Sequence, residues 1–291
     1  MDKPIRAIFL DVGNTLRFLI KDPEHQARAR REITRLAGVD CDPEAFCAQI
    51  DARYKDYRKW AFQEMREAPE EELWMRWLLP DFPAECIRAA AHELTYQYRQ
   101  ASGRRIVPPD AKSTIIELTR RRYVMGIISN LITTQEIPDW LEEEGLTPYF
   151  KSVMLSSVFG YRKPHPAIYE EATRRAGVEA ACCAYVGDNP DRDVEGTRTA
   201  GFGMVILMLD EEARQKGHHA AHNHRAGDGG HALALGDALH RGHIGEADAH
   251  DDRQHRAEPQ PPAADGEELE QRRQRRGDQR RLDEDHAALL V

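Results

Sequence analysis

Polar residues with the means to attack, bind and neutralise a phosphoryl group recur along the chain, mostly just after stretches with the pattern of buried strands. They offer carboxylates for a nucleophile or a metal ion, hydroxyls and amides for anionic oxygens, and a lysine for counter-charge. In chain order the candidates are Asp11, Gly13, Asn14 and Thr15, then Ser129 and Asn130, then Lys163, and finally Asp188 and Asp193. Each alone has an ordinary explanation as a turn residue, a helix cap or a solvated charge, so their significance depends on whether one fold gathers them.

An alternation of strand and helix patterns positions these residues. Apolar runs predict strands at 5–10, 123–128, 152–155, 182–186 and 203–209. Amphipathic patterns predict helices at 110–122, 134–144, 166–176 and 192–200. This alternation implies an α/β fold, a Rossmann-like parallel sheet with right-handed crossovers. Because the carboxyl ends of parallel strands face one crevice, we expect the candidate residues to meet there.

A long helical stretch separates the first strand from the rest of this core. Asp22-Pro23 and Asp42-Pro43 each open a helix with a proline in the first turn, and further helices are expected at 70–79 and 83–99. Aromatic residues concentrate in this stretch and predict a small core of its own. Its expected members are Trp60, Trp74, Trp77, Leu78, Leu79 and Tyr96.

The predicted domain organisation follows from these patterns. Residues 1–20 and 104–212 form the Rossmann-like core, and 21–103 form a helical insertion. Residues 213–291 form a low-complexity tail, because ten of the thirteen histidines follow residue 217 and no aromatic residue occurs from 203 onward. A segment of this composition buries too little apolar surface to offset its ordering entropy, so we expect disorder there.

Composition also bounds the class of partner. The formal net charge is −9, without a long block of one sign before the tail, which favours a soluble protein and argues against a nucleic-acid groove. The five cysteines form no C-x-x-C pair, and no apolar run approaches the roughly 20 residues of a membrane span. We therefore expect a cytoplasmic protein without membrane association, and the sequence leaves its oligomeric state open.

The ordered motifs resemble those of the haloacid dehalogenase-like (HAD) superfamily of hydrolases, over roughly residues 5–209. The four family motifs correspond to Asp11-Val12-Gly13-Asn14-Thr15, to Ser129, to Lys163, and to Gly187-Asp188 with Asp193. The insertion at 21–103 resembles the helical cap that members carry between the first two motifs. The resemblance implies a phosphatase-type hydrolase with a small phosphorylated molecule as its partner.

The resemblance also implies a nucleophile and a metal site. Asp11 would be the catalytic nucleophile and form an aspartyl-phosphate, which divides hydrolysis into two steps. Mg²⁺ would be held by Asp11, Asp188 and the backbone carbonyl of Gly13. Asp193 would hold Lys163 or a metal-bound water from behind.

Five residues are implied to bind the phosphoryl oxygens: Asn14, Thr15, Ser129, Asn130 and Lys163. Ser129 and Lys163 are in addition counted as catalytic, since hydrogen bonds and a point charge aimed at the phosphoryl group stabilise the charge that develops there.

Gly13 departs from the family pattern. Most phosphatases that this chain resembles carry a second Asp at that position as general acid and base, a role worth roughly 10²–10⁴-fold in rate. Two alternatives to an Mg²⁺-dependent phosphatase stay open. One is a 2-haloacid dehalogenase, with which Ser129-Asn130 and Tyr169 are compatible but Asp188 is not. The other is a weakly active binding protein of the same fold.

Overall fold

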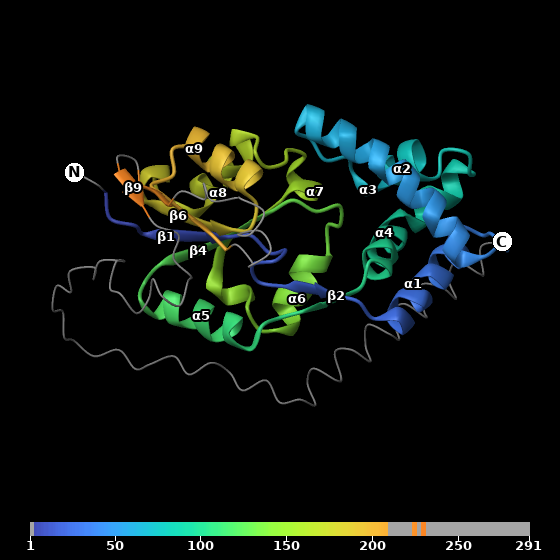
Figure 1. Ribbon diagram of the computed structural model, residues 1–291, viewed down its shortest axis with the longest axis horizontal. Coiled ribbons are helices and arrows are strands. Elements are labelled where there is room, and N and C mark those ends of the chain that lie inside the picture. Colours follow the sequence, from blue (N-terminus) through green and yellow to red (C-terminus); the bar gives the residue numbers. More distant parts are fainter. Residues whose placement is uncertain (1–2, 209–222, 226–227, 231–291) are drawn as a thin grey trace. The chain divides into compact units, whose positions relative to one another are not determined.

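The computed structural model describes residues 3–208 and the backbone of 223–225 and 228–230 (Figure 1). Five strands in this part form one parallel sheet in the order β5-β4-β1-β6-β7. They are β1 (Ala7–Leu10), β4 (Val124–Ser129), β5 (Phe150–Leu155), β6 (Cys183–Gly187) and β7 (Met204–Leu207). The predicted α/β fold with a parallel sheet is confirmed. The disorder predicted for 213–291 concerns a segment outside the described residues, apart from the short backbone strands β8 (Asn223–Arg225) and β9 (Asp228–Gly230).

β1 lies at the centre of the sheet and is buried along its whole length. Successive side chains of a strand point to opposite faces. Ile8 and Leu10 accordingly pack with α5 (Pro109–Arg120) and α6 (Glu136–Glu143), whereas Ala7 and Phe9 pack with α8 (Pro166–Ala176). Figure 1 shows these helices on opposite faces of the sheet, with α9 (Glu195–Thr199) on the α8 side. The residue that follows β1 therefore emerges at the middle of the carboxyl edge.

Short irregular elements complete the core. They are the 3₁₀ turns Thr147–Tyr149 and Ala180–Cys182, α7 (Ser156–Phe159), and a π-helical turn at Pro190–Val194. The helix predicted at 192–200 is thus split into this π turn and α9, and α6 begins two residues later than expected. No helix in the described ranges is long and apolar enough to cross a membrane.

Two short strands that the sequence patterns did not reveal bracket the helical insertion. β2 (Phe18–Ile20) and β3 (Arg104–Ile106) pair antiparallel. Between them lie α1 (Pro23–Leu36), α2 (Pro43–Glu64), α3 (Glu70–Glu72) with a following π turn (Leu73–Leu78), and α4 (Ala84–Ala101). α1 and α2 begin at the prolines where the sequence predicted, and each has a side-chain cap: Asp22 accepts from the His25 N–H at 3.1 Å and Asp42 from the Ala45 N–H at 2.9 Å.

The insertion has an apolar core of its own. Trp74, Leu78 and Leu79 are buried in it as predicted, and Trp60 and Trp77 pack against it while half-buried. Tyr96 was predicted to belong to this core but is 41% exposed. The buried residues of α4 are Ile87, Ala91, Leu94, Thr95 and Tyr98. They share one face of the helix, and Tyr96 projects from the other.

A buried carboxylate ties the two bracketing strands to the core. Glu136 at the start of α6 lies 3.1 Å from Arg17, 2.9 Å from Arg99 and 3.3 Å from Arg105. Arg17 precedes β2, Arg99 is near the end of α4, and Arg105 belongs to β3. Burial alone would raise the pKa of Glu136, but the arginines lower it to about 2. The carboxylate is therefore charged. It binds the chain segment that enters the insertion, through Arg17, and the segment that leaves it, through Arg105.

Candidate active site

Asp11 lies at the carboxyl end of β1 and is held at both carboxylate oxygens. Its backbone N–H donates to the Val186 carbonyl at 2.8 Å, which prolongs the pairing with β6. Oδ1 accepts from the Val12 N–H at 2.7 Å, and Oδ2 lies 3.0 Å from Nζ of Lys163. The side chain is only 6% exposed. Its orientation is therefore fixed by a backbone donor and a charged partner.

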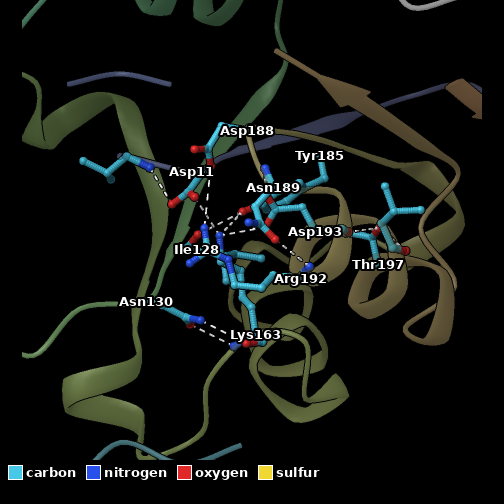
Figure 2. Close-up of polar contacts among 12 residues, drawn as sticks. Asp11, Ile128, Asn130, Lys163, Tyr185, Asp188, Asn189, Arg192, Asp193 and Thr197 are labelled. Atoms are coloured by element: carbon cyan, nitrogen blue, oxygen red, sulfur yellow. Dashed lines mark hydrogen bonds and ion pairs between the residues drawn. The ribbon is translucent and has the colours of Figure 1, made fainter. Parts of the chain in front are cut away.

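Lys163 reaches this carboxylate from the loop before α8, and its side chain is fully buried. Nζ lies 2.9 Å from Oδ1 of Asp193 and donates to the Tyr185 hydroxyl at 2.6 Å (Figure 2). Tyr185 in turn donates to the Ile128 carbonyl at 3.2 Å. Burial, with the charges of Asp193 and Asp11, raises the pKa of Tyr185 well above 10, so the hydroxyl stays protonated. Three partners thus fix the ammonium group next to Asp11.

Asp188 completes a group of three carboxylates at the ends of β1 and β6. Ligand oxygens of Asp11, Asp188 and Asp193 lie within 4.8 Å of one another. Oδ2 of Asp188 accepts from Nδ2 of Asn14 at 2.9 Å. Oδ1 of Asp188 is buried and has no hydrogen-bond partner among the described residues; Arg192 Nη2 is 3.7 Å away. Burial is the main reason that the pKa of Asp188 lies above its ordinary value.

These observations fit a hard divalent cation. A buried carboxylate oxygen without a partner is costly, and oxygen ligands suit Mg²⁺. Asp193 is already engaged by Lys163 and by the Asn189 N–H, which donates to its Oδ2 at 3.1 Å. Asp11 is likewise held at both oxygens, so Asp188 is the carboxylate whose Oδ1 is left for a cation. Of the other two side chains, Asp11 is 6% exposed and Asp193 is fully buried, which makes Asp11 the more accessible second ligand. Asp193 occupies the supporting position expected from the sequence.

The two asparagines lie at the site but are engaged by neighbouring residues. Nδ2 of Asn130 donates to the Lys163 carbonyl at 2.9 Å, and its Oδ1 accepts from the Lys163 N–H at 2.8 Å. Asn14 has φ of 54°, which Asn tolerates, and this conformation accompanies its contact with Asp188. The contacts that the structure gives these two amides are thus to Lys163 and Asp188, where the sequence led us to expect phosphate.

The remaining phosphate candidates are buried at the same edge. Ser129 is the last residue of β4 and is 5% exposed. Thr15 is 6% exposed, and within the described ranges its hydroxyl has no hydrogen-bond partner. A buried hydroxyl without a partner is suited to an incoming anion.

Two glycines have opposite roles at the site. No described atom beyond the chain neighbours of Gly13 would lie within 4 Å of a Cβ built there, so the space is open where the family usually places an acid. A Cβ at Gly187 would meet Oδ2 of Asp193 at 2.3 Å. Gly187 therefore permits the close approach that brings Asp193 to Lys163.

Sequence reasoning missed two polar residues of the site. Tyr185 sits in an apolar strand, where an aromatic residue is more simply explained as core. Arg192 was counted only as the start of a helix, yet its buried Nε has no partner in the described part of the chain and its charge acts on Asp188. The alternation of strand residues could have placed Tyr185 on the Phe9 face. No local signal aims Arg192 at the carboxylates.

The structure is thus a parallel α/β sheet with a buried carboxylate–lysine pair at its central carboxyl edge. Residues 5–201 match the family of haloacid dehalogenase-like hydrolases, so the chain belongs to that family and is a hydrolase.

Individual relatives agree with this family. A phosphoserine phosphatase from Thermus thermophilus is 28% identical over 253 residues, covering 77% of this chain and 96% of that protein. A glyceraldehyde 3-phosphate phosphatase from Methanopyrus kandleri is 26% identical, covering 70% and 84%. The solved structure of a 2-haloacid dehalogenase from Pseudomonas syringae pv. tomato DC3000 has a TM-score of 0.51 at 22% identity, covering 70% and 86%, which supports the fold alone.

Proposed function

We propose that this protein is an Mg²⁺-dependent phosphatase that hydrolyses a small phosphorylated metabolite through an aspartyl-phosphate on Asp11. The observation that carries the proposal is the pairing of Asp11 with the buried Lys163 beside Asp188, whose Oδ1 has no hydrogen-bond partner in the described structure. This set supplies a nucleophile, a counter-charge and a cation ligand at one point. The phosphatases among the relatives support the same reaction.

In this mechanism Asp11 attacks phosphorus, and the bond from phosphorus to the leaving oxygen breaks. Val12 and Lys163 hold the carboxylate in place for the attack. Water then hydrolyses the aspartyl-phosphate, which releases inorganic phosphate and restores Asp11. Since Gly13 has no proton to give, the leaving oxygen takes its proton from solvent.

The other residues of the site bind the phosphoryl oxygens and offset their negative charge. Lys163 faces the phosphoryl charge, and the hydroxyls of Thr15 and Ser129 are the expected donors to phosphoryl oxygens. Asp11, Asp188 and the Gly13 carbonyl would hold Mg²⁺, which when bound offsets charge repulsion between nucleophile and phosphate. Asp193 keeps Lys163 in position.

The helical insertion is the expected cap of the site. Lids of this kind exclude water and contribute contacts to the substrate. Two polar residues of the insertion are engaged within it: Arg53 donates to the Leu78 carbonyl, and Tyr57 donates to Glu67. Trp60 and Trp77 are half-buried, with ring centroids 5.3 Å apart and planes tilted by 35°, and they are candidates for contact with the substrate.

A 2-haloacid dehalogenase is the weaker alternative. Its substrate carries a carboxylate, which Asp188 would repel, and its mechanism leaves Asp188 without a purpose. The third alternative is a protein of this fold that binds a ligand with little turnover, which Gly13 and the unusual composition of the tail favour.

A panel of phosphate esters assayed with and without Mg²⁺, beside a panel of 2-haloacids, tests the proposal. We expect Mg²⁺-dependent phosphate release that is lost in Asp11→Asn and kept in Asp191→Asn, which alters an exposed carboxylate in the π-helical turn after β6. Halide release without metal would establish the dehalogenase instead. Ligand binding without turnover in either panel would establish the third alternative.

The proposal also covers the compartment in which the protein works and the molecules that it binds. All five cysteines are free thiols, which agrees with the reducing cytoplasm expected from the sequence. We propose a small phosphorylated molecule as the partner, and neither nucleic acid nor membrane.

A further inference from the structure

Glu67, between α2 and α3, is a fully buried carboxylate for which the proposed mechanism has no use. Nη1 of Arg162 donates to both of its oxygens at 2.9 Å. The Ser156 hydroxyl donates to Oε2 at 2.7 Å, and the Tyr57 hydroxyl donates to Oε1. Two of these partners, Arg162 and Ser156, belong to the sheet core, whereas Glu67 and Tyr57 belong to the insertion. The Glu67 carboxylate therefore links the insertion to the sheet core through buried contacts.

The first branch of these contacts leads to Lys163. The Glu67 N–H donates to the Gly160 carbonyl at 3.0 Å, and the Arg162 N–H donates to the Met65 carbonyl at 2.9 Å. These bonds form a short antiparallel bridge between Arg66 and Tyr161. The segment paired with the insertion thus ends one residue before the lysine that holds the nucleophile.

The second branch leads to Ser129. The Ser156 hydroxyl that donates to Glu67 also accepts from the Leu131 N–H at 3.0 Å. Leu131 is two residues beyond Ser129, and the next residue, Ile132, is buried in the apolar core of the insertion. The loop after β4 therefore packs directly against the insertion at Ile132 and is linked to Glu67 through Ser156 at Leu131.

We propose that Glu67 is a positioning residue that fixes the Lys163 loop and the Ser129 loop relative to each other, so that both phosphate-binding groups depend on one carboxylate of the insertion. A buried ion pair is rarely a net source of stability compared with apolar packing, so its presence calls for a geometric reason. The converging contacts supply that reason, since they end in the two loops that must meet one phosphoryl group. This inference rests on the proposed phosphatase function for its kinetic consequence, though not for its structural one.

The test compares wild type with Glu67→Gln, which keeps the size of the side chain and removes its charge. Glu72→Gln is the control, because Glu72 forms a solvent-accessible ion pair with Arg76, its one ion-pair partner in the part of the chain that the structure describes. Amide hydrogen exchange should accelerate in the peptides covering 129–134 and 160–165, and not in the peptide covering 183–188. With Mg²⁺ and a turned-over ester, kcat should fall on the order of 10- to 100-fold, the cost of a displacement of about 1 Å, while the Mg²⁺ concentration for half-activation stays as in wild type. Glu72→Gln should match wild type in both.

Unchanged exchange in both loops of a folded Glu67→Gln protein would overturn the proposal, as would a lower melting temperature with kcat per folded enzyme unchanged. If Glu67→Gln does not fold, Ser156→Ala removes only the second branch. It should accelerate exchange at 129–134 and lower kcat, and no change in either would equally overturn the proposal. If wild type hydrolyses no ester, the proposed function fails, and the exchange data still decide the role of Glu67.

Discussion

Replacing Gly13 with Asp should increase the rate of phosphate release. The position has room, because no described atom beyond its chain neighbours lies within 4 Å of the added Cβ, and Gly13 is not among the residues with positive φ. Asp at this point would stand two residues beyond the nucleophile and could protonate the leaving oxygen and then activate water.

The expected gain is about tenfold in kcat, equivalent to about 1.4 kcal/mol of barrier. General acid–base catalysis is worth roughly 10²–10⁴-fold where the group is oriented by neighbours. The same open space that admits the side chain leaves it without an orienting partner, so the gain should fall below that range. Fold stability should change little. Replacing a glycine lowers the conformational entropy of the unfolded chain and so stabilises the fold by about 0.4–1 kcal/mol, and repulsion from Asp11 and Asp188 offsets this gain.

The assay is steady-state phosphate release at saturating Mg²⁺, with Gly13→Asn as the matched control. Asn has nearly the same shape and hydrogen-bonding reach but transfers no proton. The ratio of kcat between Gly13→Asp and Gly13→Asn isolates proton transfer. A ratio near one, in two folded proteins that still require Mg²⁺, would refute the reasoning and indicate that another group already serves as acid.

Three further outcomes are expected. Lys163→Met should lower the free energy of unfolding by about 3–5 kcal/mol in a urea titration, because Asp11 and Asp193 lose their buried counter-charge; a loss below about 1 kcal/mol would contradict the buried pairing. Gly187→Ala should cost about 1–3 kcal/mol in thermal unfolding, because its Cβ would displace Asp193, whereas Gly13→Ala should be close to neutral. The pKa of Glu136 is lowered from 4.5 to about 2, so its contribution to stability is complete above about pH 4.5 and is lost as the pH falls toward 2, a change of about 3 kcal/mol. Glu136→Gln should lack that part of the acid transition, and an identical acid titration of the two proteins would show that the arginines do not hold the carboxylate as described.

Much of the fold could be predicted because the relevant signals are local. The buried run before Asp11, the helix starts at Asp22-Pro23 and Asp42-Pro43 and the alternation of strands and helices depend only on neighbouring residues. β2 and β3 escaped prediction because each is three residues long and is paired across the whole insertion, a contact that no local pattern encodes. Tyr96 was assigned to the wrong face for a related reason: an aromatic side chain predicts burial in general, but only the packing of α4 decides which of its faces is inside.

The sequence by itself determined which chemical groups the site has, since strand ends and glycines locate Asp11, Ser129, Lys163 and Asp188 along one edge of a parallel sheet. Only the tertiary structure decided how those groups are used. It assigns the amide of Asn130 to the backbone of Lys163, adds the Tyr185 hydroxyl as a third partner of the lysine, and joins Glu67 of the insertion to both loops. The physical reason is that hydrogen bonds and ion pairs inside a protein depend on which buried donor and acceptor come within about 3 Å of each other. The residues named here are 22 to 89 positions apart and meet only when the whole chain has packed.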